Sequence, residues 1–249
     1  SPRWCSMPLV EAGGLHAYGV LGIGEVRPGD DVGALLADAL GPPGSGVLRE
    51  GDVVVVTQKV VSKAEGRLVA VDHGDPAQKR SVVEAESVRV LRRRGELLVT
   101  ETAHGFVCAN AGVDLSNVGD GWAALLPVDP DRSARRIRAE LGRRLSVIVG
   151  VVVSDTFGRP WRNGVTDVAI GAAGIAAVVD LRGTSDATGR ELVATQVCVV
   201  DEVAAAAELV MGKDRSVPAA IVRGVPPAWL REGSVRDEIV RAPAEDLFR

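Results

Sequence analysis

Two long runs of β-branched residues constrain this chain more than any other feature. Val53–Thr57 follows the turn residues Gly51 and Asp52, and a second run covers residues 147–153. Because neither run alternates apolar with polar residues, both predict strands that are buried on both faces. A third run, Ala219–Val222, has the same character. We therefore expect strands that are covered on both sides.

The remaining segments predict a mixture of shorter strands and helices. Asp129 followed by Pro130 supplies a cap and a first-turn proline for a helix that runs through Leu145. Further helices are expected over 30–40, 79–93 and 202–211, and shorter strands over 97–100, 106–109, 165–170 and 176–181. Strands and helices do not alternate regularly, so the prediction is a mixed α+β fold.

The bulk composition excludes several classes of protein. The chain has 249 residues, of which 46% are hydrophobic and only 3% aromatic, with a formal net charge of -4. This balance is that of a globular domain, and an acidic chain with few aromatic residues is a poor general binder of nucleic acids. The three cysteines are far apart and form no metal-binding pair. No apolar run approaches the roughly 20 residues that cross a bilayer, and we expect a cytoplasmic protein.

The common nucleotide-binding motifs are missing from the sequence. No P-loop motif occurs, and Gly22 and Gly24 lack the third glycine of the dinucleotide fingerprint, since Arg27 stands in its place. The fold is therefore expected to be neither a P-loop nor a Rossmann fold.

The segment that most resembles a site covers residues 151–164. A buried strand is expected to end near Asp155, and a loop rich in Gly, Pro and Arg is expected to follow. Asp155 and the hydroxyl of Thr156 are hard oxygen ligands that suit Mg²⁺ or Mn²⁺. Arg159 and Arg162 carry donors that match phosphate oxygens. The alternative is a turn with surface arginines.

Three other segments carry groups of the same kind. Asp114 and Asn117 lie in an oxygen-rich stretch, and Lys59 and Lys63 are spaced to share one face if their segment is helical. The glycine-broken loop over 22–30 would let backbone N–H groups approach a ligand. Ordinary turns and solvated lysines are the alternatives.

Taken in order, these segments resemble the coenzyme F420 γ-glutamyl ligase family. The resemblance rests on the strings Lys-Val-Val-Ser-Lys-Ala-Glu-Gly-Arg at 59–67, Gly-Val-Asp-Leu-Ser-Asn-Val at 112–118 and Gly-Arg-Pro-Trp-Arg-Asn-Gly at 158–164. It covers the chain from about His16 to Phe248. Gln58 departs from the family, which often has Ser there, and Gly24 stands where Pro is common.

The resemblance implies an amide-forming ligase. Such enzymes use GTP and a divalent metal, Mg²⁺ or Mn²⁺, to add L-glutamate to the lactyl phosphate tail of the deazaflavin coenzyme, and further γ-linked glutamates can follow. An acyl phosphate of the tail is the expected intermediate, and K⁺ is an additional expected cation. The family fold is mixed α+β and the usual assembly is a homodimer. One ligase domain over 1–249, or two intertwined subdomains, is expected, with no reductase-like domain after it.

The resemblance also assigns residues. Asp114, Asp155 and Thr156 fall at metal-ligand positions. The positions that contact GTP are Ile23, Gly24, Glu25, Val26, Gln58, Lys63 and Asn117. The expected catalytic residues are Asp114, Asp155 and Lys63, together with Arg159. The resemblance does not assign Arg159, Arg162 or Arg223; these three are our own candidates for holding the substrate's phosphate or carboxylates.

Two other functions remain open at this point. A metal-dependent nucleotide phosphohydrolase could use the same Asp114 and Asp155 without glutamate or coenzyme. A non-catalytic module could bind the coenzyme and present it to a partner.

Overall fold

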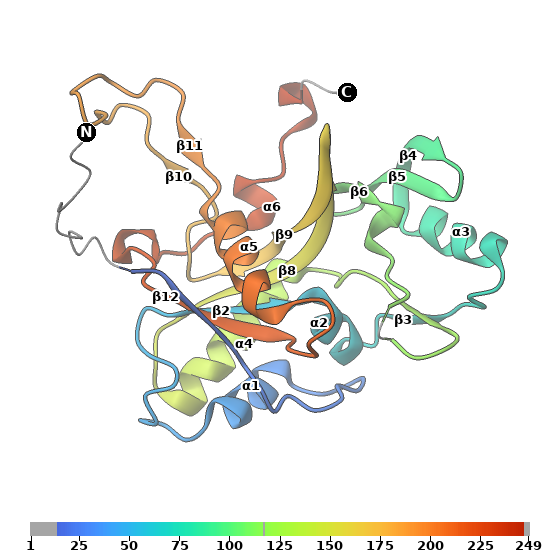
Figure 1. The fold of residues 1–249 in the computed structure, drawn as a ribbon, viewed down its shortest axis with the longest axis horizontal. Helices are drawn as coiled ribbons and strands as arrows, with labels where there is room; N and C mark the ends of the chain where they lie inside the picture. Colours follow the sequence, from blue (N-terminus) through green and yellow to red (C-terminus); the bar gives the residue numbers. More distant parts are fainter. Residues whose placement is uncertain (1–13, 117, 247–249) are drawn as a thin grey trace, which may run out of the picture.

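A five-stranded sheet forms the centre of the protein (Figure 1). The computed structural model describes residues 14–116 and 118–246. The strand order is β1-β12-β2-β8-β9, in which β2 and β8 run parallel and every other pair is antiparallel. The strands are β1 (His16–Gly19), β12 (Ala219–Arg223), β2 (Val53–Thr57), β8 (Gly150–Arg159) and β9 (Arg162–Ala173).

Helices cover both faces of this sheet. One face packs against α1 (Val32–Leu40), α2 (Gln58–Ala64) and α4 (Pro130–Leu145), and the other packs against α5 (Val199–Met211) and α6 (Val235–Glu238). Successive valines of β2 alternate between the two hydrophobic cores, and none is exposed. The prediction of strands buried on both faces is therefore confirmed, as is the mixed α+β fold.

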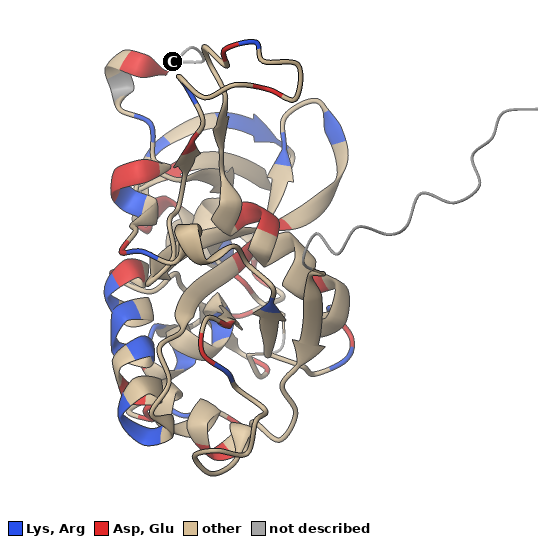
Figure 2. Cartoon of the chain, turned by 90° about the vertical axis from the view of Figure 1, so that its left-hand side faces the viewer, with Lys and Arg blue, Asp and Glu red and all other residues tan. Residues whose placement is uncertain are grey.

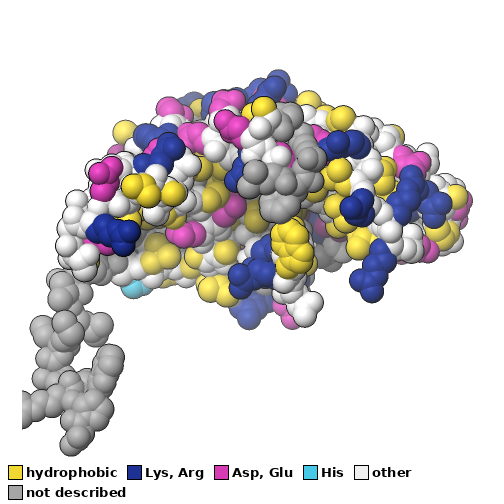
Figure 3. Space-filling model, turned by 90° about the horizontal axis from the view of Figure 1, so that it is seen from above, with side chains coloured by type: hydrophobic (Ala, Val, Ile, Leu, Met, Phe, Trp, Pro, Cys, Tyr) yellow, Lys and Arg dark blue, Asp and Glu magenta, His cyan; other side chains and the backbone are white. Residues whose placement is uncertain are grey.

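Smaller sheets surround the central one. A three-stranded sheet, β4-β5-β6, has its own small core and packs beside α3. Of two further pairs of short strands, β3-β7 lies near this sheet, and β10-β11 lies above α5 in the view of Figure 1. Acidic and basic residues lie mainly on helices and loops (Figure 2), and basic side chains gather at the end where β4 and β5 lie (Figure 3). The smaller sheets and the helix beside them consist of α3 (Pro76–Ala85), β4 (Ser87–Arg94), β5 (Leu97–Thr102), β6 (Val107–Ala109), β3 (Leu68–Ala70), β7 (Trp122–Ala124), β10 (Val179–Asp180) and β11 (Gln196–Val197).

Some predicted elements are wrong in part. The helix expected over 79–93 ends at Ala85, and the rest of that segment pairs with β5 as strand β4. The loop expected after Asp155 is instead strand, because β9 pairs with β8 as far as Arg159 and satisfies its backbone groups. The strand expected over 176–181 is limited to Val179–Asp180.

Other boundaries agree closely with the sequence. The helix capped by Asp129 runs to Leu145 as predicted, and the helix expected from Asp30 begins at Val32 with Asp31 as its cap. Between residues 225 and 246, the structure describes only short helices: α6 and single 3-10 turns at Pro227–Trp229 and Pro243–Glu245. A further 3-10 turn spans Asn110–Gly112. Within the described residues, no helix combines the length and apolarity needed to cross a membrane.

A buried carboxylate joins α4 to two other parts of the fold. Asp131 lies in the first turn of α4 and is 5% exposed. One of its oxygens accepts from the backbone N–H groups of Ala172 in β9 (2.8 Å) and Val235 in α6 (3.0 Å). The other accepts from the Ser234 hydroxyl (2.9 Å) and the Arg236 N–H (3.1 Å). Asp131 thus fixes the C-terminal region against the central sheet.

We expect Asp131→Ala to lower the free energy of unfolding by about 3 kcal/mol or more, because it leaves several donors without an acceptor, at least two of them in buried hydrogen bonds. Urea denaturation followed by circular dichroism measures the change.

Asp129→Ala is the matched control on the same helix. Its carboxylate caps the helix by accepting from the Arg132 N–H at 2.9 Å, so its loss should cost only about 1 kcal/mol. Equal losses for the two variants would contradict the role given to Asp131.

Candidate active site

The parallel pairing of β2 and β8 sets the position of the site. Thr57 lies opposite Ser154, and both strands are leaving the buried core at that point. The next residue of β2's segment is Gln58, which begins α2, and the next residue of β8 is Asp155. The start of α2 and Asp155 are therefore neighbours at one edge of the sheet.

Asp114 reaches the same region through an ion pair. The ammonium of Lys59 in α2 lies 2.8 Å from a carboxylate oxygen of Asp114, and it also donates to the Ser116 hydroxyl at 3.0 Å. The other oxygen of Asp114 accepts from the Ser116 N–H at 2.7 Å. The segment 58–64 is helical, so Lys59 and Lys63 share a face, as predicted.

Asp155 lies in surroundings that disfavour its charge. The pKa of Asp155 is raised to about 7, with burial as the largest cause. The negative charges of Asp114 and Asp167 act in the same direction, while the Thr156 N–H and the Lys213 ammonium act in the opposite direction. An additional positive charge beside Asp155 would therefore lower its pKa and favour its ionised form.

Asp114 behaves in the opposite way. Partial burial alone would raise its pKa, but the hydrogen bonds and charge of Lys59, together with the Ser116 donors, hold the pKa of Asp114 below its ordinary value. The pKa values of the two carboxyls are therefore shifted in opposite directions, and the charge of Asp114 contributes to the shift of Asp155.

Thr156 lies on the opposite face of β8 from Asp155, because side chains alternate along a strand. Its hydroxyl donates to Asp167 in β9 at 2.6 Å, and Ser154 donates to the other Asp167 oxygen at 3.0 Å. Lys213, just after α5, bonds to Thr156 and lies 3.1 Å from Asp167. The structure therefore separates the Thr156 side chain from the Asp114–Asp155 pair.

The residues predicted to contact a nucleotide flank α2. Lys63 lies 2.6 Å from the Glu25 carboxylate, which joins the 22–30 loop to this helix. Ile23 packs at the edge of the core, Gly24 is exposed and Val26 is buried. Asn117 lies outside the described residues.

Gln58 has an unsatisfied donor. The side chain is 2% exposed, and its carbonyl oxygen accepts from the Ser62 hydroxyl at 2.6 Å. Its amide nitrogen is buried without a partner in the described part of the chain. An unpaired buried donor is costly, so this group is suited to meet a ligand or water.

The three arginines fall in two different places. Arg159 and Arg162 lie opposite each other at the exposed tip of the β8–β9 hairpin, away from the buried core. Arg223 at the end of β12 instead makes two hydrogen bonds to Asp52, at 2.8 and 2.7 Å, and lies over the Tyr18 ring. Its guanidinium is therefore engaged within the fold.

Sequence reasoning did not identify Asp167 or Lys213. Asp167 is 1% exposed inside a strand, and a lone carboxylate within the apolar run of β9 was the signal available.

Cys108 is also buried near Asp155, and burial together with the charge of Asp155 raises the pKa of its thiol to about 12. A thiolate nucleophile is therefore disfavoured at this position.

Comparison with known proteins gives a consistent result. The family model described as F420-0:Gamma-glutamyl ligase matches residues 21–224. A coenzyme F420:L-glutamate ligase of Methanothermobacter thermautotrophicus is 42% identical over 251 residues, covering 95% of this chain and 99% of the relative. A relative of the same name from Methanopyrus kandleri is 44% identical over 242 residues, covering 90% of this chain and 94% of its own length.

These matches define the class as a ligase with a mixed α+β fold. Within that class, the chain belongs to the F420-0:gamma-glutamyl ligase family. The resemblance found in the sequence is confirmed.

The pKa of Asp155 predicts a pH-dependent gain in stability for Asp155→Asn. A carboxyl whose pKa rises from 3.8 to about 7 on folding favours the folded state while protonated, and that contribution is lost as pH rises between those values. Since Asn carries no charge, the variant avoids this loss. In metal-free buffer, the difference in melting temperature between the variant and the original chain should widen from pH 5 to pH 8.

Asp38→Asn is a suitable control, because Asp38 is an exposed residue of α1 paired with Arg144 at 3.0 Å. Its effect should not show the same dependence. A constant difference for Asp155→Asn across this range would show that the carboxyl titrates normally.

Proposed function

We propose that this chain is a GTP- and metal-dependent ligase that joins L-glutamate to the lactyl phosphate tail of the F420 precursor. The observation that carries the proposal is the Asp114–Asp155 pair beside Lys59 and the buried Gln58 amide. Family membership supports the ligase class. The nucleotide, the metal and the order of steps are what the family resemblance implies, and the chemistry of these residues is compatible with them.

The two carboxylates fit a divalent cation. No group of three His, Cys, Asp or Glu residues that could hold a metal occurs among the described residues, so the protein would provide two carboxylate ligands. Mg²⁺ commonly uses one or two carboxylates and completes its shell with phosphate oxygens and water. The charge of Asp114 raises the cost of ionising Asp155, which a cation would relieve. When bound, the metal would screen phosphate charge during transfer.

The proposed reaction has two displacements. A carboxylate oxygen of the tail attacks the γ-phosphorus of GTP, GDP leaves, and an acyl phosphate forms. The glutamate amine then attacks the acyl carbon, inorganic phosphate leaves, and an amide bond results. The same chemistry on a terminal γ-carboxyl would add further γ-linked glutamates.

The chain's own residues would bind and orient these anions. Lys63 and Lys59 supply positive charge from one face of α2, and the free Gln58 amide supplies a fixed neutral donor. Arg159 and Arg162 extend the positive charge along the β8–β9 hairpin. Donors fixed before the reaction stabilise phosphoryl transfer without reorganising during it.

The assembly and the monovalent cation are part of the same proposal. We propose a homodimer that uses K⁺ as an additional cation and acts in the cytoplasm. Sedimentation equilibrium of the full chain measures the assembly, and a monomer at all concentrations would contradict it.

The reaction predicts a defined set of products. Protein, GTP, Mn²⁺ or Mg²⁺, L-glutamate and the glutamate-free coenzyme should yield GDP, phosphate and a coenzyme heavier by one or more glutamyl units by mass spectrometry. Phosphate release without glutamate or coenzyme would instead support the phosphohydrolase. Tight coenzyme binding without turnover at any metal concentration would support the binding module.

We expect Asp155→Asn to lower turnover by about 100-fold or more, because it removes a charged ligand while keeping the shape of the side chain. Steady-state GDP formation measures the effect, and Asp38→Asn should leave it within about twofold. Activity within a few-fold of the original would overturn the assignment of Asp155 to the metal.

A further inference from the structure

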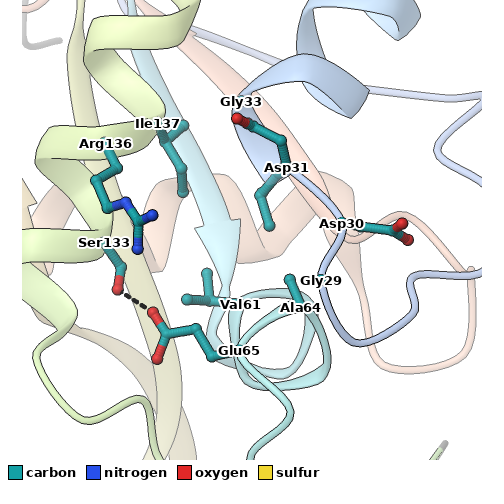
Figure 4. A pocket seen from close by; sticks show the side chains of 11 residues that line it. Gly29, Asp30, Asp31, Gly33, Val61, Ala64, Glu65, Ser133, Arg136 and Ile137 are labelled. Carbon is teal, nitrogen blue, oxygen red and sulfur yellow. Dashed lines mark hydrogen bonds between the residues drawn. The ribbon is translucent and has the colours of Figure 1, made fainter.

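A cavity of about 250 Å³ lies between the start of α1, the end of α2 and the first turns of α4 (Figure 4). Its lining comes from residues 29–33, from Val61, Ala64 and Glu65, and from Ser133, Arg136 and Ile137 on α4. Pockets for drug-sized ligands run from about 300 to 1,000 Å³, so this cavity suits a smaller molecule.

The cavity is separate from the site described above. At about 100° per residue, Val61 and Glu65 lie on the face of α2 opposite Lys59 and Lys63. Those lysines contact Asp114 and Glu25, and neither lysine lines the cavity. A ligand of the cavity would therefore contact α2 from its other side.

Two charged groups facing this space are incompletely paired. One oxygen of Glu65 accepts from the Ser133 hydroxyl, and the second has no partner among residues 14–116 and 118–246. Arg136, one helical turn from Ser133, forms no hydrogen bond or ion pair within the described part of the chain. Figure 4 shows its guanidinium extending toward the side of the cavity that holds Ser133 and Glu65.

The other carboxylates of the cavity are held by local hydrogen bonds. Asp31 caps α1 by accepting from the Ala34 N–H at 3.0 Å, and Asp30 accepts from the Arg27 N–H at 2.7 Å. The Asp30 side chain points away from Arg136 in Figure 4. Arg136 is the cationic side chain of the lining, and Glu65 is the carboxylate toward which it extends.

A small molecule that carries both a positive and a negative charge would pair with both Glu65 and Arg136. An ammonium pairs with the Glu65 carboxylate, and a carboxylate matches the paired donors of the Arg136 guanidinium. Val61 and Ile137 supply apolar surface for the carbon chain between them. We infer that this cavity binds a small α-amino acid. The choice of L-glutamate as probe rests on the proposed function, which makes it the amino acid of the reaction.

Isothermal titration of L-glutamate into the full chain, without nucleotide or metal, tests the inference. One saturable site is expected, and Arg136→Gln and Glu65→Gln should each weaken binding about tenfold or more. Arg135→Gln is the matched control, because Arg135 is the neighbouring exposed arginine and does not line the cavity. It should change the affinity less than about twofold, and thermal unfolding checks that every variant is folded.

Two ligands test the need for both charges. Glutarate lacks the amine and butylamine lacks the carboxylate, so each should bind about tenfold more weakly than L-glutamate. Undiminished binding by glutarate, unchanged binding by Arg136→Gln, or no saturable binding would overturn the inference.

The same data separate this inference from the proposed function. Ligase activity in a chain that does not bind L-glutamate without nucleotide overturns the inference alone. Arg136-dependent binding without any ligase activity supports the inference and contradicts the proposed function.

Discussion

The parallel alignment of β2 with β8 determines where every part of the site lies. Two adjacent parallel strands end at the same edge of a sheet, so the segments that follow them meet there. One strand continues into α2 with its two lysines, and the other carries Asp155. The register is held by valines packed on both faces, and a slip of one residue would exchange the two cores.

Charge at this edge is unevenly balanced. Lys59 compensates Asp114 directly, whereas burial and the neighbouring carboxylates raise the pKa of Asp155 to about 7 against the opposing charge of Lys213. An arrangement of this kind is unfavourable for the isolated fold and favourable for cation binding. Functional regions commonly concentrate such unfavourable charges.

The sequence predicted the parts of the fold that depend on local patterns. The three strands built on apolar runs and the helix from Pro130 to Leu145 follow from composition, capping and period. The segment 86–94 and the continuation of β8 beyond Asp155 could not be predicted, because both become strand only through pairing with segments that follow later in the chain. Asp155 and Asp114 were identified by residue type and family order. Lys213 was not, since Asp167 and Thr156, which it contacts at the site, lie more than forty residues away in sequence.

Asp155 and Thr156 are consecutive in the chain but face two different environments. The Asp155 carboxyl responds to burial and to the charge of Asp114, whereas the Thr156 side chain bonds to Asp167 and Lys213. The two faces are not independent, because the charges of Asp167 and Lys213 also act on Asp155, and the Thr156 N–H donates to its carboxylate. A substitution on one face of β8 should therefore alter the electrostatics of the other face.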